Sequence, residues 1–255
     1  MYIKEPYKKH RYYWILLGLL LILLPLGIYL KGMAVKSEAQ NRAAKPQRKP
    51  LEQRTVIIDP GHGGTDPGAC RAGVMEKDIN LAIAKRVARH AAGYEVKFTR
   101  DKDVDFTKHG VYTKEAERQD LDQRIEMARS LGGEVFVSIH VNTGLGQDGG
   151  AIIYYNQNNQ GSVRLARIIQ KEMNELSGMS KRPRADHFYL FEHLNIPVII
   201  IEAGWLCNPE ERERLQDPDY QDQLAGAIGR GISEFLKTTR KNNQRPSGTA
   251  DPIFD

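Results

Sequence analysis

The stretch "VIIDPGHGGTDPGA", Val56–Ala69, indicates both the fold and the first candidate for chemistry. It opens with a short β-branched run that is typical of a buried strand. The run ends at Asp59, and His62 then follows among glycines. Because glycine has no Cβ, such a backbone can approach a metal or a substrate closely. An imidazole placed directly after a buried strand is therefore a candidate functional group.

Further apolar runs of strand length lie downstream: "EVKFT", "EVFVSIHV", "AIIYY" and "PVIIIEA". Between them, apolar residues recur at helical spacing, as at Ile79, Ile83 and Val87. Alternating strands and helices predict a single α/β domain with a largely parallel sheet covered by helices on both faces. The stretch "FYLF", residues 188–191, also has a strand-like composition. In such sheets the functional groups gather at the carboxyl ends of the strands.

An uncharged segment near the N-terminus, "YYWILLGLLLILLPLGIYL" (Tyr12–Leu30), has the length of a membrane span, since a helix must cross ~30 Å of hydrocarbon. A cleaved signal peptide is the alternative, but the apolar core exceeds the roughly 7–15 residues usual for one. We therefore predict an uncleaved transmembrane helix. More basic residues precede it than closely follow it, so we expect the remainder of the chain to be exported.

The predicted organisation has five parts: a basic cytoplasmic N-terminus (1–11), the anchor (12–30), a polar basic linker (31–53), the folded domain (54–238) and a flexible tail (239–255). The net charge of +5 over 255 residues is concentrated near the N-terminus and in the linker. The middle of the chain is close to charge-balanced and has no aromatic-plus-basic stripe, so we expect no nucleic-acid partner. Cys70 and Cys207 form no CxxC pair and are interpreted as free thiols.

Three predicted strands end in groups that bind metals or move protons. His62 follows the first strand, His140 closes "EVFVSIH" and Glu202 closes "PVIIIE". Glu76, in "MEKDIN", stands in the first turn of a helix, where a carboxylate is also favourable for ordinary electrostatic reasons. Two histidines and a carboxylate are a common ligand set for catalytic zinc. A further glutamate would then act as general base, and Asp59 would orient an imidazole or cap the loop.

These residue types alone leave metal binding open. A glycine-rich turn after a strand can simply cradle an anion, although "GHGGTDPG" matches neither the GxGxxG nor the Walker spacing. A histidine at a strand end can also be a hydrogen-bonded structural residue. Ligand spacing over long stretches of sequence is only weakly diagnostic, so the residues need further support.

The order of four motifs supplies that support: "DPGHGG", "EKDIN", "SIHVN" and "PVIIIEAGWLCNPEE". Together they resemble the zinc-dependent N-acetylmuramoyl-L-alanine amidases of the type 3 family, from about Arg54 to Leu236. The resemblance implies that His62, Glu76 and His140 bind Zn²⁺ and that Glu202 is the catalytic glutamate. It also implies a mostly parallel sheet of about six strands, within the usual range for sheets.

Other residues fit the same family pattern. Arg124, in "LDQRIEMARS", and Asn142, after the second histidine, are expected to bind substrate or support the ligands, as is Asp59. The chain departs from the common pattern at Trp205 and Cys207, where the family usually has Phe and Ser. Neither position is a ligand or the base, so we expect activity to be retained.

Within the family, the chain resembles the membrane-anchored, germination-specific amidases of the spore cortex. The single N-terminal span, the absence of a wall-binding repeat and the polar insertion at residues 101–118 carry this resemblance. It implies an extracytoplasmic enzyme of a spore-former that removes stem peptides from muramic acid on the way to muramic-δ-lactam. Peptidoglycan is the expected substrate, and an activating protein is a possible partner.

Three alternative functions stay open: a vegetative cell-wall amidase, another zinc hydrolase, or a non-catalytic peptidoglycan-binding homologue. A vegetative amidase can also carry one anchor. The filled set of four motif positions argues against a non-catalytic homologue. The sequence leaves the 101–118 insertion open as a groove wall, a docking surface or a lid.

Overall fold

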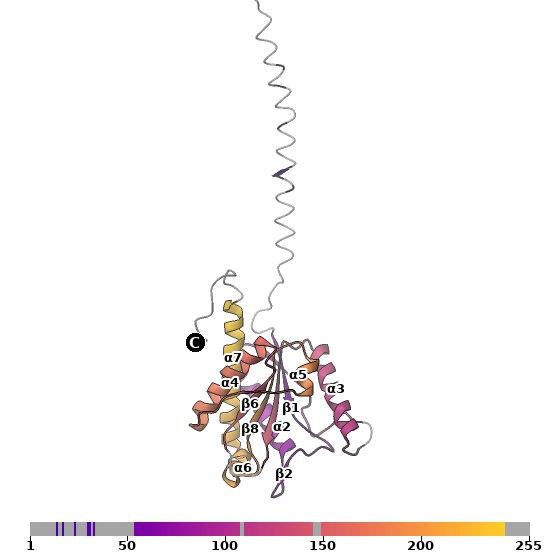
Figure 1. Ribbon diagram of the computed structural model, residues 1–255, viewed down its shortest axis with the longest axis vertical. Helices are drawn as coiled ribbons and strands as arrows, with labels where there is room; N and C mark the ends of the chain where they lie inside the picture. Colours follow the sequence, from indigo (N-terminus) through magenta and orange to yellow (C-terminus); the bar gives the residue numbers. More distant parts are fainter. Residues whose placement is uncertain are drawn as a thin grey trace, which may run out of the picture. The chain divides into compact units, whose positions relative to one another are not determined.

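The computed structural model describes residues 54–107, 110–144 and 149–242, together with a few isolated positions between 14 and 33. Within these residues, no helix is both long and apolar enough to cross a membrane. The predicted N-terminus, anchor, linker and tail lie almost wholly outside the described residues. The α/β domain that follows Lys49 forms one compact unit (Figure 1).

A sheet of six strands forms the centre of this unit, and it confirms the predicted fold class. Its spatial order is β4 (Glu95–Phe98), β1 (Thr55–Pro60), β5 (Val135–Asn142), β8 (Val198–Trp205), β6 (Ile152–Tyr155) and β7 (Arg184–Ala185). All neighbouring pairs run parallel except β6 and β8, which are antiparallel. A small antiparallel pair, β2 (Cys70–Arg71) and β3 (Val74–Met75), lies outside this sheet.

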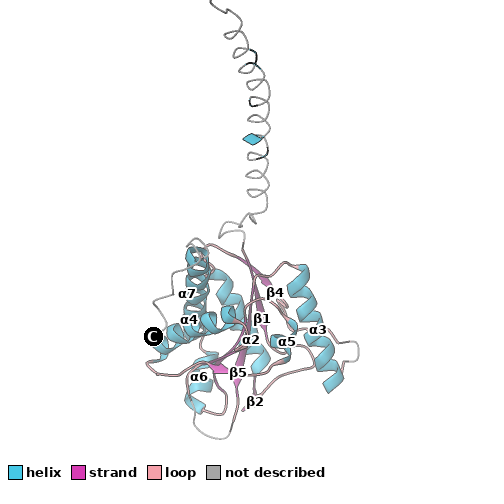
Figure 2. Cartoon of the chain, turned by 45° about the horizontal axis from the view of Figure 1, so that its top comes forward, coloured by secondary structure: helices cyan, strands magenta, loops and turns pink. Residues whose placement is uncertain are grey.

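Helices cover both faces of the sheet, as predicted (Figure 2). One face carries α2 (Glu76–Arg89), α4 (Gln160–Ser177) and α7 (Pro218–Asn242), and α6 (Pro209–Gln216) packs against α7 and β8. The other face carries α3 (Lys114–Ser130) and α5 (Tyr189–His193). Alternate residues of β1 supply the two cores: Val56 and Ile58 face the first set of helices, and Ile57 faces the second. This alternation follows from the two-residue period of a strand.

The last three residues of "FYLF" are helical and Phe188 is the N-cap, so the strand-like interpretation was wrong. These residues form most of α5, in which Leu190 and Phe191 are buried against the sheet together with Leu194 just beyond the helix. The spacing from Leu190 to Leu194 is one helical turn, and an apolar run of four residues does not separate a strand from a buried helix. The C-terminal helix α7 runs to Asn242, across the predicted domain limit at residue 238.

Candidate metal centre

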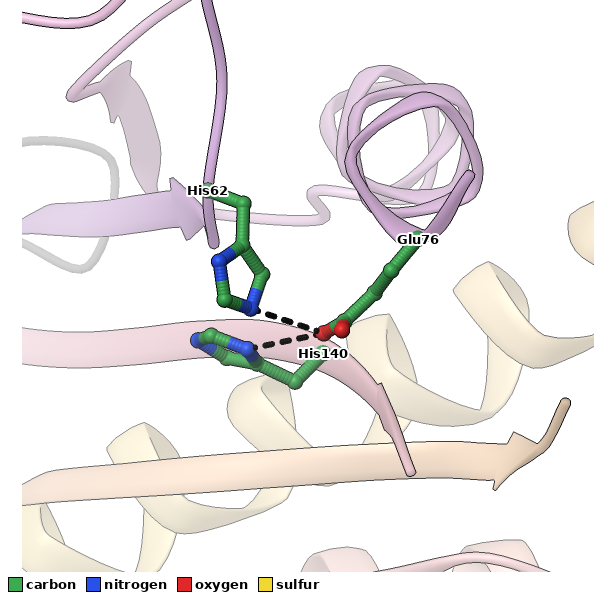
Figure 3. A group of neighbouring side chains, drawn as sticks. All are labelled: His62, Glu76 and His140. Atoms are coloured by element: carbon green, nitrogen blue, oxygen red, sulfur yellow. Dashed lines mark hydrogen bonds and ion pairs between the residues drawn. The ribbon is translucent and has the colours of Figure 1, made fainter. Parts of the chain in front are cut away.

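Three predicted ligands lie together at the carboxyl edge of the sheet. His62 follows β1, Glu76 is the first residue of α2, and His140 lies in β5. One ligand atom from each residue lies within 4.8 Å of the others. Figure 3 shows the side chains pointing toward one another, with Glu76 Oε1 3.2 Å from His62 Nε2 and 3.0 Å from His140 Nδ1. The fold therefore brings two imidazoles and one carboxylate to a common point.

The electrostatics of this cluster favour a positive charge. Burial by itself would lower the pKa of His62, but hydrogen bonds to Asp66 and Glu76 raise it to about 10. Burial would likewise raise the pKa of Glu76, yet the hydrogen bonds to His140 and His62 hold it well below its usual range. Without a metal, a proton on an imidazole supplies the positive charge. A divalent cation bound to the same imidazole nitrogens and carboxylate oxygen would supply that positive charge instead. The residues therefore fit a zinc site.

Backbone and side-chain donors fix the Glu76 carboxylate. Oε1 accepts from Val141 N at 3.1 Å, and Oε2 accepts from Ala69 N at 2.9 Å. Asn80, one turn further along α2, donates to Glu76 Oε1 at 3.3 Å and to Gly61 O at 3.1 Å. Asn80 is fully buried, and sequence reasoning missed it. Its position four residues after the carboxylate, on the same helix face, was the available signal.

His62 is oriented by a carboxylate on its own loop. Its Nδ1 lies 2.6 Å from Asp66 Oδ2, which leaves Nε2 directed at Glu76. A carboxylate bonded to the second ring nitrogen commonly fixes the tautomer and orientation of a metal-binding histidine. Asp66 was also missed, although a carboxylate four residues after His62 is visible in "HGGTD". The backbone of His62 has a φ of 61°, which is rare for a residue with a side chain.

The surrounding glycines make room for the ligands themselves. A Cβ on Gly61 would lie 2.2 Å from the His140 ring. Gly68, with a φ of 62°, would place a Cβ 2.6 Å from Glu76 Oε2 and 2.7 Å from His62 Cδ2. The glycines do clear space near the site, as expected, but the ligand side chains of the protein fill that space.

Asp59 and Arg124 form a buried network beneath the loop. Asp59 accepts from Thr99 Oγ1 at 2.5 Å, from Ser138 Oγ at 2.6 Å and from Arg124 Nη1 at 2.6 Å. Arg124 also donates to the carbonyl oxygens of Pro60 and His62 at 2.9 and 2.8 Å. The two residues therefore hold the backbone that carries His62. Asp59 acts through Arg124 rather than by orienting an imidazole directly.

The remaining predicted positions lie along β5 and β8. Asn142 ends β5 and pairs in register with Trp205, and its carbonyl oxygen accepts from Leu206 N at 2.8 Å. The Trp205 indole donates to Gly150 O at 3.1 Å.

Cys70 and Cys207 are free thiols, as predicted.

Glu202 lies opposite His140 in the parallel pairing of β5 and β8. Its Oε2 is buried and, among the described residues, has no hydrogen-bond partner. Burial raises the pKa of Glu202 to about 7, opposed by the nearby His140. A buried carboxyl group whose pKa lies near neutrality is suited to accept and return a proton.

Comparison with known protein families agrees with this arrangement. The profile of one family, described as N-acetylmuramoyl-L-alanine amidase, matches residues 56–234. The chain belongs to this type 3 amidase family. This confirms the resemblance seen in the sequence, and the protein is an N-acetylmuramoyl-L-alanine amidase that acts on peptidoglycan.

Relatives within the family include one enzyme described as germination-specific. The germination-specific N-acetylmuramoyl-L-alanine amidase of Bacillus subtilis is 33% identical over 205 residues, covering 78% of this chain and 86% of that protein. The CwlD amidase of Clostridioides difficile, solved in complex with the GerS lipoprotein, is 35% identical with a TM-score of 0.69. That match covers 73% of this chain and 100% of the solved one. The catalytic domain of CwlV from Bacillus (Paenibacillus) polymyxa is 31% identical, with a TM-score of 0.62 over 72% of this chain and 99% of that domain.

Proposed function

We propose that this amidase is zinc-dependent and that His62, Glu76 and His140 hold the ion. Two imidazole nitrogens and one carboxylate oxygen are donors that zinc accepts in catalytic sites, where a fourth position stays open to water. Their convergence within 4.8 Å and the local preference for positive charge support the assignment. The bond cleaved is the amide between the lactyl group of N-acetylmuramic acid and L-alanine.

Glu202 is the general base and acid of the proposed reaction. When bound, zinc would polarise the scissile carbonyl and acidify water in the site. Glu202 accepts a proton from the attacking water at its carboxylate and returns it to the leaving amine of alanine. Burial maintains a pKa near 7, which suits both transfers at neutral pH.

One observation carries this proposal: the buried Glu202 Oε2 has no hydrogen-bond partner among the described residues, and it lies on the strand position paired with His140. An unsatisfied buried oxygen is unfavourable for folding, since a buried polar group without a partner costs about 1–3 kcal/mol. Its retention beside three convergent ligands is explained if it handles a proton during turnover.

We further propose that the enzyme acts outside the cytoplasm, anchored by residues 12–30, on the spore cortex in muramic-δ-lactam formation. The germination-specific relative from B. subtilis supports the cortex role. The lipoprotein complex of the C. difficile relative supports a protein partner for this chain.

The test uses the purified full chain with one equivalent of Zn²⁺ on cortex and vegetative peptidoglycan in parallel. Mass spectrometry scores newly freed N-terminal alanine, with Glu202→Gln as the matched control. Release that is lost in the variant supports the zinc mechanism, and a preference for cortex supports the spore role. Faster release from vegetative peptidoglycan would instead indicate an autolysin. Zinc binding without release from either protein would contradict the proposed activity of the isolated chain.

A further inference from the structure

We propose that Asp103 and Asp105, here called the aspartate pair, are positioning residues that fix the His62 loop (His62–Asp66) and thereby set zinc affinity. The inference rests on the proposed zinc site and extends it to the 101–118 insertion. It assigns the beginning of that insertion to the metal centre.

The His62 loop leaves two backbone donors at its tip. Gly63 and Asp66 close the turn on each other, with N–O distances of 2.9 and 3.0 Å. The N–H groups of Gly64 and Thr65, between them, therefore point out of the turn toward other partners. Because Asp66 also orients His62 through its 2.6 Å contact, any shift of this turn moves the ring of the ligand.

The aspartate pair accepts hydrogen bonds from both backbone donors at the tip of the loop. Gly64 N donates to Asp103 Oδ1 at 2.7 Å. Thr65 donates to Asp105 Oδ2 twice, from its backbone N at 2.6 Å and from Oγ1 at 2.7 Å. Charged acceptors make these bonds stronger than neutral ones. Two carboxylates some forty residues away in sequence thus hold the tip of the loop.

The aspartate pair is itself anchored. Lys77 Nζ bridges Asp103 Oδ2 and Gly64 O, each at 2.8 Å, and so ties the loop to α2 next to the ligand Glu76. Asp105 Oδ1 accepts from Thr107 N at 3.1 Å and from Thr107 Oγ1 at 2.9 Å. Both oxygens of each carboxylate are therefore hydrogen-bonded: the half-exposed Asp103 links the loop to Lys77 of α2, and Asp105 links the loop to Thr107 of its own segment.

The backbone of the loop needs such support. His62 has a φ of 61°, which is rare for a residue with a Cβ, whereas Gly63 and Gly64 adopt φ values of 136° and 55° without that penalty. Sparsely populated backbone conformations persist only where surrounding contacts over-determine them, and they cluster at functional sites. The loop packs closely against the segment that carries the aspartate pair, since a Cβ on Gly63 would lie 2.3 Å from Val104 O. Loss of the aspartate pair would let the loop relax away from the geometry that presents His62.

Asparagine substitution tests this with little change in shape. In Asp103→Asn, the amide oxygen can face either Gly64 N or Lys77 Nζ, so the amide nitrogen opposes a donor at the other position. The same conflict arises in Asp105→Asn between Thr65 and Thr107. Asp101→Asn is the matched control, because Asp101 belongs to the same segment and is exposed, as Asp103 is.

The experiment uses the full chain and measures the zinc Kd by competition with a chelator. Circular dichroism of the zinc-free protein follows thermal unfolding, and kcat is measured at saturating zinc. Loss of groups that support a ligand typically weakens metal binding ~10–100-fold. We expect a rise of about tenfold in Kd for each variant and more for the double variant, by the same reasoning. We expect the Kd of Asp101→Asn to be unchanged and saturating zinc to restore kcat in all three variants.

An unchanged Kd in the double variant overturns the proposal, whether or not its thermal midpoint falls. A kcat that stays low at saturating zinc also overturns it, because the pair would then act on substrate instead. Zinc binding by the wild type shows that the ligand assignment stands even if the aspartate pair fails. A wild type that binds no zinc would refute the proposed function itself.

Discussion

Two carboxylates at the same edge of the sheet, the buried Asp59 and the partly buried Glu202, have opposite properties. Asp59 accepts from two hydroxyl groups and a guanidinium, and although burial opposes ionisation, Arg124, Ser138 and Thr99 keep its pKa below the usual value. Glu202 is partly buried, its buried Oε2 has no partner among the described residues, and desolvation raises its pKa to about 7. Desolvation acts to raise the pKa of both carboxyl groups, and only around Asp59 do hydrogen-bond donors reverse that effect.

The difference separates a structural carboxylate from a reactive one. A carboxylate saturated with donors stays ionised and holds its neighbours, as Asp59 holds Arg124 and through it the His62 loop. A carboxylate denied donors can change protonation state near neutral pH. Environments that drive two titratable groups apart in pKa are a recognised guide to acid and base assignments.

The largest effect is expected for Glu202→Gln, which keeps the side-chain shape and removes the base. General acid–base groups typically contribute about 10²–10⁴-fold to rate, so kcat on peptidoglycan should fall by that factor. The zinc Kd should stay close to that of the wild type. Release of N-terminal alanine, measured together with zinc binding, checks both. Retained turnover would remove Glu202 from the proposed mechanism.

Asp59→Asn should act on stability instead. It removes one of the two carboxylates paired with the buried Arg124, since Asp120 Oδ2 stays 2.5 Å from Arg124 Nε. Breaking one side of a buried ion pair costs about 3–5 kcal/mol, and the remaining pair with Asp120 should hold the loss at the lower end of that range. Denaturant unfolding of the zinc-free protein measures this loss, with Glu202→Gln as the comparison that should not lose stability. A loss below about 1 kcal/mol would place Asp59 outside the structural network, since that is the range of a surface pair.

The two carboxylates should also give opposite pH dependence. Because the folded pKa of Glu202 is raised from 4.5 to about 7, zinc-free folded protein binds the extra proton and loses stability as pH rises through that window. Relative to Glu202→Gln, the loss should reach up to about 3 kcal/mol, at 1.36 kcal/mol per pKa unit. Asp59, with a lowered pKa, contributes stability that is lost as pH falls below about 4.

Denaturant unfolding of the wild type and of Glu202→Gln in chelator between pH 4 and 8 checks the sign predicted for Glu202. The difference in unfolding free energy between wild type and Glu202→Gln should grow with pH and level off above 7. A difference that is flat across this range would contradict the raised pKa of Glu202.

The smallest effect is expected for Ser138→Ala, which removes one donor from Asp59. Hydrogen bonds to charged groups contribute about 1.5–3 kcal/mol, so the variant should lose roughly that much unfolding free energy. Ser130→Ala is the matched control, because Ser130 is exposed on α3 and its hydroxyl bonds only locally to Met127 O. Equal losses in both variants would argue against the Asp59 network.

The strands and the main candidate residues were predictable from local pattern. Buried parallel strands appear as continuous apolar runs, so the residues that end them could be named. His140 and Glu202 come from such runs, and the pairing of β5 with β8 places them opposite each other. The family resemblance assigned their roles and that of Glu76, which the residue types alone had left open.

The supporting contacts were not predictable, because they join residues distant in sequence through side-chain geometry. Arg124 was named as a candidate, but its contact with His62 O spans 62 positions. Asp103 and Asp105 lay in a polar insertion with no pattern to link them to the His62 loop. The helix α5 was misread because four apolar residues carry no resolvable period.

The central claim is that His62, Glu76 and His140 together hold one zinc ion beside Glu202. Anomalous diffraction from crystals of the zinc-loaded protein, recorded on both sides of the zinc absorption edge, tests it most directly. We expect one strong peak within bonding distance, about 2.0–2.2 Å, of all three ligand side chains, with the Glu202 carboxylate beside it and not among the ligands. A peak elsewhere, or the absence of any peak at these residues, would contradict it.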